Sequence, residues 1–113
     1  MTADLVDRLM GLWTTPLPAD DEQALAAVRA LYTDPVEVNG ASLTAGDLLA
    51  RARAVQGAYS GLHHRLLDRV ETPDRLVVAF RLCGTHTGAL TTPLGTVAPT
   101  GRAVEIRTID VLT

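Results

Sequence analysis

The order of hydrophobic patterns along the chain predicts a single α+β domain, with helices first and antiparallel strands afterwards. Up to Gly57 the apolar residues recur with the period of about 3.6 residues that is typical of a helix. After Gly57 they alternate, as in a strand with one buried face. Since 113 residues allow one hydrophobic core, we expect one domain over residues 1–113, with helices packed on one face of a sheet.

Three amphipathic helices are expected in the first half of the chain. The first carries leucines at i, i+4 and i+7 from Leu5 and ends before Pro16. The second begins near Asp20 and ends before Pro35, because the residue before a proline avoids helical angles. The third is capped by Thr44, with an aspartate three residues later. The residues expected to face the core include Leu9, Leu12, Ala24, Val28, Leu31, Tyr32, Leu48, Ala52 and Val55.

Strands account for most of the remaining sequence. A short strand is expected at 36–39, where Gly40 ends it. Three longer strands are expected at 62–70, 75–85 and 102–112, joined by a turn at 71–74 and a Gly/Pro/Thr-rich connection at 87–101. The last strand reaches the end of the chain without a following turn. An unpaired edge invites association, so we expect either more sequence in the natural protein or a partner chain, as in a homodimer.

Composition and charge argue against several classes of protein. The net charge is −3 and the basic residues, all arginine, are scattered, so no nucleic-acid partner is expected. The single Cys83 rules out an internal disulfide and a cysteine zinc cluster, which suits a reducing cytoplasm. The N-terminus lacks the pattern of a signal peptide, and no apolar run is long enough to cross a membrane. We therefore expect a cytoplasmic protein without a membrane partner.

Several short motifs resemble the SnoaL-like polyketide cyclase family, within the nuclear transport factor 2-like, ketosteroid isomerase-like superfamily. They are Gly-Thr-His-Thr-Gly at 84–88, Pro-Thr-Gly-Arg at 99–102 and Ile-Asp-Val at 109–111, with more diffuse similarity at 31–38 and 59–68. The resemblance runs from about residue 5 to residue 112. It implies a cone-shaped fold, in which three N-terminal helices pack on a curved, mostly antiparallel sheet around a pocket. The family's last strand, which carries an acid/base aspartate in the cyclases, has no counterpart in this sequence.

Asp110 is the first candidate for chemistry, because alternation places it on the inner face of the last strand. It shares this face with Ile106 and Leu112, whereas Glu105 and Arg107 mark the other face as outer. Burial raises the pKa of a carboxyl group, so Asp110 could donate a proton or a hydrogen bond to an oxyanion. Its Ile-Asp-Val context resembles that of the ketosteroid isomerase acid. The alternatives are an aspartate that accepts backbone hydrogen bonds, or an exposed one.

His64 is the candidate general base. It shares its expected face with Leu62, Leu66 and Asp68, and a neutral imidazole can accept a proton near pH 7. A histidine at the edge of the core, with one satisfied hydrogen bond, is the alternative. The three histidines lack the spacing of metal ligands, so neither a metal nor another cofactor is expected.

Five further residues are candidates for binding a small apolar ligand. Isomerases of the superfamily place a general-base aspartate near Asn39, but an amide cannot take up a proton, and Asn39 before a glycine is also an ordinary turn residue. His86 would line the pocket rim or fix the loop that follows it. Tyr32 offers a phenol donor, with core packing as the alternative, and Phe80 and Ile106 would line the pocket with apolar surface.

Three functional hypotheses follow from these residues. The first is a cofactor-independent cyclase or isomerase-type enzyme that acts on an apolar carbonyl compound, polyketide- or terpenoid-like, with Asp110 as acid and His64 as base. The second is a non-catalytic ligand-binding or dimerisation module of the same fold. The third, a limonene-type epoxide hydrolase, is disfavoured because Arg107 and Asp110 fall on opposite faces of a regular strand.

Overall fold

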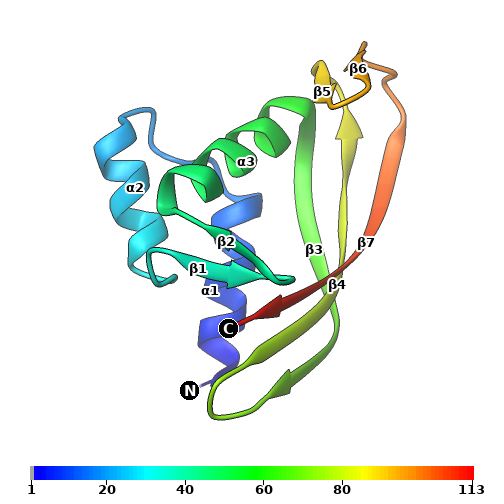
Figure 1. Cartoon of the computed structure of the whole chain (residues 1–113). Coiled ribbons are helices and arrows are strands. Elements are labelled where there is room, and N and C mark those ends of the chain that lie inside the picture. Colours follow the sequence, from blue (N-terminus) through cyan, green and yellow to red (C-terminus); the bar gives the residue numbers. More distant parts are fainter. Residues whose placement is uncertain (1) are drawn as a thin grey trace.

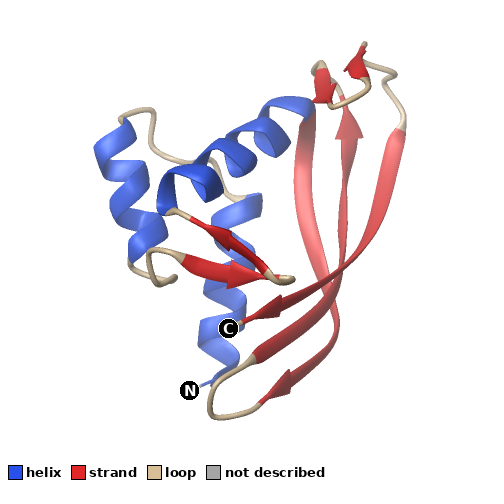
Figure 2. Cartoon of the chain, viewed as in Figure 1, coloured by secondary structure: helices blue, strands red, loops and turns tan. Residues whose placement is uncertain are grey.

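The computed structural model describes residues 2–113 and confirms the mixed α/β architecture with three helices and an antiparallel sheet (Figures 1 and 2). The elements are α1 (Thr2–Thr14), α2 (Asp21–Arg29), β1 (Val36–Val38), β2 (Ala41–Leu43), α3 (Ala45–Ala58), β3 (Tyr59–Glu71), β4 (Leu76–His86), β5 (Leu90–Thr92), β6 (Gly95–Val97) and β7 (Ala103–Leu112). The β5–β6 hairpin lies inside the segment that the sequence predicts as a connection. None of the described helices has the length and apolar character needed to cross a membrane.

The main sheet has the strand order β2-β1-β7-β4-β3, and all of its pairs are antiparallel. The long strands β3, β4 and β7 form a curved surface, and the helices lie on one side of it (Figure 2). Strand β7 pairs with β4 over its full length. On its other side it meets β1 at the single pair Val38 and Leu112. The short β1–β2 hairpin is therefore attached only to the C-terminal end of β7.

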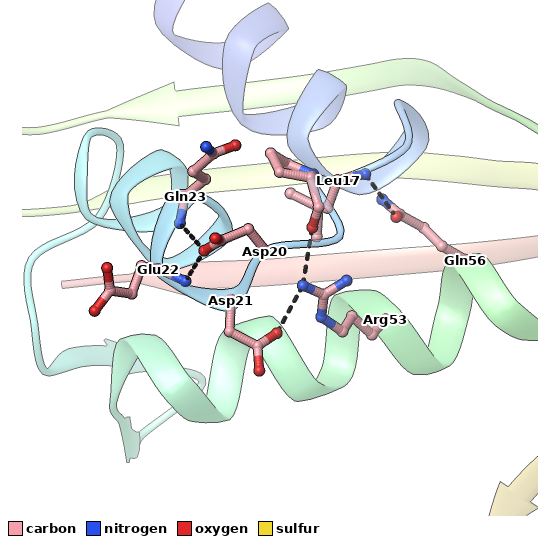
Figure 3. A network of polar contacts seen from close by, with 8 residues as sticks. Leu17, Asp20, Asp21, Glu22, Gln23, Arg53 and Gln56 are labelled. Atoms are coloured by element: carbon pink, nitrogen blue, oxygen red, sulfur yellow. Dashed lines mark hydrogen bonds and ion pairs between the residues drawn. The ribbon is translucent and has the colours of Figure 1, made fainter.

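Side-chain caps begin α2 and α3 where the sequence predicts them. The Asp20 carboxylate accepts hydrogen bonds from the backbone N–H groups of Glu22 and Gln23, at 2.8 and 3.2 Å (Figure 3). At α3, Thr44 and Asp47 form the reciprocal capping box. The Thr44 hydroxyl accepts from the Asp47 N–H at 3.1 Å, and the Asp47 carboxylate accepts from the Thr44 N–H at 2.9 Å. These bonds satisfy N–H groups that the first turn of a helix leaves without a partner.

The interior consists of two hydrophobic clusters. The first joins α2, the β1–β2 hairpin and α3, and contains Ala24, Val28, Val36, Leu43, Ala45, Leu48 and Leu49. The second joins α1 to β4, and contains Val6, Leu9, Met10, Val78 and Phe80. The half-buried Tyr32 packs against both clusters. The face of β4 that carries Val78 and Phe80 is therefore the inner, concave face of the sheet.

One side chain of α3 ties that helix to the C-terminal end of α1. The Gln56 amide nitrogen donates to the carbonyl oxygens of Leu12, Trp13 and Thr15, at 3.1, 3.1 and 2.9 Å. Its amide oxygen accepts from the N–H of Leu17 at 3.2 Å (Figure 3). The amide thus satisfies carbonyl groups at the end of α1 that have no partner within the helix.

A bulge in β3 overturns one expectation about its faces. His64 and Leu66 lie opposite Leu82 and Phe80, and thus on the concave face. The register then shifts, so that Asp68 lies opposite Ala79, on the convex face. The expectation that Asp68 shares a face with His64 is therefore wrong, because one extra residue reverses the alternation beyond Leu66.

Candidate functional site

Asp110 lies on the concave face of the sheet, as the alternation in β7 predicts. It is directly opposite the buried Val78 of β4, and directly opposed residues of an antiparallel pair project to the same face. The Asp110 side chain is half-buried. Because β7 pairs with β4 without a register shift, the strand alternation read from the sequence holds over its whole length.

Asn39 holds both the backbone of β7 and the Asp110 side chain. Its amide nitrogen is 3.4 Å from the Asp110 carboxylate and 3.4 Å from the carbonyl oxygen of Ile109. Its amide oxygen accepts from the N–H of Val111 at 2.8 Å, and its own N–H donates to the Val111 carbonyl at 2.9 Å. Asn39 has a φ of 51°, a left-handed conformation that asparagine tolerates better than most residues. This conformation supports the expected role of Asn39 as a turn residue, and a contact of Asn39 with a ligand stays a prediction.

Burial raises the pKa of the Asp110 carboxyl above its ordinary value. The hydrogen bond from Asn39 and the positive charge of Arg51 act in the opposite direction, because both stabilise the carboxylate. Asp110 therefore holds its proton more tightly than an exposed aspartate. Sequence reasoning did not identify Arg51, since nothing in the pattern of α3 relates it to β7.

Tyr32 supplies a second polar group close to Asp110. Burial raises the pKa of its phenol, the hydrogen bond from Trp13 lowers it, and the negative charge of Asp110 raises it. The indole N–H of Trp13 donates to the phenol oxygen at 3.1 Å. Because this bond uses an oxygen lone pair, the phenol proton is available for another acceptor. Trp13 belongs to α1, so this hydrogen bond also connects α1 to Tyr32.

A hollow of about 300 Å³ lies beside Tyr32, at the end of the sheet where β3 turns into β4. Its walls include Leu5 and Leu9 of α1, together with Leu112, which lies two residues beyond Asp110 on the same strand face. This hollow opens to the surface. The enclosed pocket that the family resemblance implies stays a prediction.

The structure does not bring His64 to Asp110. His64 lies opposite Leu82 of β4, and Leu82 lies opposite Ile106 of β7. Asp110 is therefore two strands away from His64 and a further four residues along β7. With strands spaced by about 4.8 Å and residues by about 3.3 Å, the two backbones are roughly 16 Å apart.

Phe80, Ile106 and His86 differ in how much surface they offer a ligand. Phe80 is 7% exposed and packs against α1, whereas Ile106 is 39% exposed on the same concave face. His86 is buried, and its Nδ1 accepts from the N–H of Thr100 at 3.3 Å and lies 3.1 Å from the Thr100 hydroxyl. This geometry supports the role of His86 in fixing the following loop, and a contact of His86 with a ligand stays a prediction.

Arg107 lies opposite Arg81 of β4, on the convex face, whereas Asp110 lies on the concave face. These two residues therefore do not form the arginine–aspartate pair of a limonene-type hydrolase.

Comparison with known proteins identifies the fold. No protein-family model matches the chain, and no curated protein matches it either. Among solved structures, a proposed SnoaL-like polyketide cyclase from Jannaschia sp. CCS1 is similar over 96% of this chain and 73% of that one, with a TM-score of 0.70 and 18% identity. AclR, a proposed hydroxylase from Streptomyces galilaeus, is similar over 98% and 79%, with a TM-score of 0.65 and 14% identity.

A third structure is an NTF2-like protein of unknown function from Exiguobacterium sp. 255-15. It is similar over 95% of this chain and 83% of that one, with a TM-score of 0.62 and 18% identity. The chain therefore has the SnoaL-like, NTF2-like fold, and the resemblance seen in the sequence is confirmed at that level. Since the three structures carry different descriptions, the fold by itself does not select an activity.

Proposed function

We propose that this chain binds an apolar carbonyl compound, polyketide- or terpenoid-like, and catalyses a cyclase or isomerase-type reaction without a cofactor. The observation that carries the proposal is the Asp110 carboxyl, which is half-buried on the concave face with a raised pKa. A half-buried carboxyl group with a raised pKa is better suited to an acid role than an exposed aspartate. The similarity of fold to a proposed SnoaL-like polyketide cyclase supports the same class of reaction.

In this proposal two donors act on one carbonyl oxygen. Asp110 in its protonated form and the phenol of Tyr32 would donate hydrogen bonds to the oxygen on which negative charge develops as the enolate forms, while solvent water takes up the proton that the adjacent carbon loses. Donors held in place before the reaction stabilise such charge more than water does. Asn39 would act as a positioning residue, because it holds Asp110 and the adjacent backbone of β7. Ile106 would contact the apolar part of the substrate.

A second candidate is a non-catalytic ligand-binding module of the same fold. The observation in its favour is the separation of roughly 16 Å between Asp110 and His64, which is too far for Asp110 to act on a carbonyl oxygen while His64 acts on the adjacent carbon. A module of this kind would bind the same class of ligand and leave it unchanged.

Hydrogen–deuterium exchange at the carbon next to a ketone tests the reaction type without knowledge of the substrate. A panel of apolar cyclic ketones is incubated with the protein in D₂O, and deuterium incorporation is followed by mass spectrometry. We expect the protein to accelerate exchange for at least one ketone. Asp110→Asn should reduce the acceleration by about 100-fold or more, the usual contribution of a general acid. Tyr32→Phe should reduce it less.

The control variant is Asp68→Asn, which changes an exposed aspartate on the convex face. It should leave exchange unchanged. A ketone that raises the unfolding temperature of the protein but does not exchange would favour the binding module. If Asp110→Asn exchanges as fast as the unchanged protein, Asp110 is not the acid.

A further inference from the structure

Three arginines lie side by side across the convex face of the sheet. Arg65 of β3 lies directly opposite Arg81 of β4, and Arg81 lies directly opposite Arg107 of β7. Directly opposed residues of antiparallel strands project to the same face, so these three side chains form a row, which we call the arginine row. The helices lie on the other side of the three strands (Figure 2). The arginine row is therefore on the opposite face of the sheet from Asp110.

The positive charge of the arginine row is only partly neutralised. The Arg81 guanidinium pairs with the Glu105 carboxylate at 3.0 Å. Arg65 and Arg107 are exposed, and among the described residues no carboxylate, including that of Asp68 on the same face, lies within ion-pairing distance of either. Like charges in directly opposed positions destabilise a sheet. Three positive charges and one negative charge leave the row with a net charge of +2, which a bound anion would neutralise.

A hollow of about 430 Å³ lies beside the arginine row and opens to the surface. Its walls include His63, Cys83 and Glu105, which are directly opposed to one another on β3, β4 and β7. Each of them is two residues from the arginine of its own strand, a step of about 7 Å along the same face. Glu105 lines the hollow and also pairs with Arg81, so the hollow and the arginine row form one continuous surface.

His63 offers this hollow a hydrogen-bond acceptor. Its Nδ1 lies 3.0 Å from the carbonyl oxygen of Gly61. A carbonyl oxygen only accepts, so Nδ1 carries the proton of the neutral imidazole and Nε2 carries the lone pair. The Nε2 atom can therefore accept a hydrogen bond from an N–H or O–H group of a ligand.

We propose that the convex face binds a small organic phosphate, with its phosphate group on the arginine row and its organic part in the hollow. A phosphate monoester carries a charge of about −1.5 to −2 at pH 7, which matches the net charge of the row better than the single charge of a carboxylate does. Guanidinium groups also donate paired hydrogen bonds to phosphate oxygens. The site lies on the opposite face from Asp110, so it does not depend on the proposed catalytic function.

The thiol of Cys83 reports whether the hollow is occupied. Cys83 is the only cysteine of the chain and lines the hollow, so its alkylation by iodoacetamide can be followed by mass spectrometry. Phenyl phosphate is the probe, added at constant ionic strength. We expect it to slow alkylation in a saturable manner. Benzoate and inorganic phosphate should slow it much less, because benzoate carries a single charge and inorganic phosphate has no organic part.

Substitutions in the arginine row test the contact with the phosphate group. Arg65→Gln and Arg107→Gln should each raise the concentration of phenyl phosphate that gives half-maximal protection by roughly tenfold, because each removes one charged donor. Neither substitution breaks an ion pair within the chain. Arg8→Gln is the matched control, since it makes the same change of charge at an exposed position of α1. It should leave the protection unchanged.

Three outcomes would overturn the proposal. In the first, phenyl phosphate protects Cys83 no better than benzoate or inorganic phosphate. In the second, Arg8→Gln weakens the protection as much as Arg107→Gln does. In the third, Cys83 resists alkylation without any ligand and becomes reactive when the protein is diluted, which would mean that a second copy of the chain covers this face.

Discussion

At the level of single residues, we expect the carboxyl of Asp110 to make the stability of the protein depend on pH. Its pKa is raised in the folded protein above the ordinary value of 3.8, so the folded state favours the protonated form. The resulting stabilisation is complete below the unfolded pKa and is lost as the pH rises through the folded pKa. Asp110→Asn keeps a neutral group at this position at every pH. We therefore expect the variant to unfold at a higher temperature than the unchanged protein at pH 7.

Circular dichroism melts between pH 3.5 and pH 8 check this expectation. The difference in unfolding temperature should shrink as the pH falls and be smallest at the acidic end of this range, because below pH 3.8 more than half of the unfolded chains carry a protonated Asp110. A constant difference at all pH values would mean that burial does not raise the pKa of Asp110.

At the level of the elements, the contact between α3 and the C-terminal end of α1 depends on the hydrogen bonds of Gln56. Gln56→Ala removes the donor to the carbonyls of Leu12, Trp13 and Thr15 and the acceptor for Leu17. Leaving such half-buried backbone groups without partners costs about 1–3 kcal/mol. We expect a loss of this size in the free energy of unfolding, measured in urea.

The control variant for Gln56→Ala is Gln23→Ala, which lies on the exposed surface of α2. Its side-chain amide has no hydrogen-bond partner among the described residues. Surface changes of this kind usually stay within about 0.5 kcal/mol. Equal losses of unfolding free energy for the two variants would show that the Gln56 hydrogen bonds do not stabilise the contact between α1 and α3.

At the level of the whole molecule, a close approach of two backbones attaches the helical layer to the sheet. The N–H groups of Thr87 and Gly88 donate to the carbonyl of Ala58, at 3.1 and 3.0 Å. A Cβ atom at Gly88 would lie 1.9 Å from the carbonyl oxygen of Gly57, so the backbone would have to move. We expect Gly88→Ala to destabilise the protein by about 1–3 kcal/mol, as overpacking does.

The other glycine of this contact provides the comparison. A Cβ at Gly57 meets nothing within 4 Å, and Gly57 lies inside α3. Gly57→Ala should therefore stabilise the protein by about 0.5–1 kcal/mol through helix propensity. Urea unfolding of both variants measures the contrast, and losses of similar size would show that the close approach at Gly88 is not the cause.

Features that depend on local sequence were predictable, and those that depend on register or distant packing were not. The caps at Asp20 and Thr44 follow from short-range spacing, and the face of Asp110 follows from alternation in a strand without bulges. The hydrophobic pattern does not indicate the bulge after Leu66 in β3, so the predicted face of Asp68 was wrong. The separation of His64 from Asp110 depends on strand order and register, which one strand's pattern does not contain.

The candidate site was predictable to a similar degree. Asp110, Asn39 and Tyr32 were all named from the sequence, and each lies at or near the same part of the concave face. The contribution of Arg51 and the hydrogen bond from Trp13 were not predictable, because they depend on how α1 and α3 pack against β7 and Tyr32.

The amide of Asn39 takes the place that a further strand residue would occupy beside Val111. Strand pairing joins the β1–β2 hairpin to β7 at one residue pair only, Val38 and Leu112. The bonds of Asn39 to both backbone groups of Val111 therefore fix the hairpin, and the helices packed on it, to the end of the sheet.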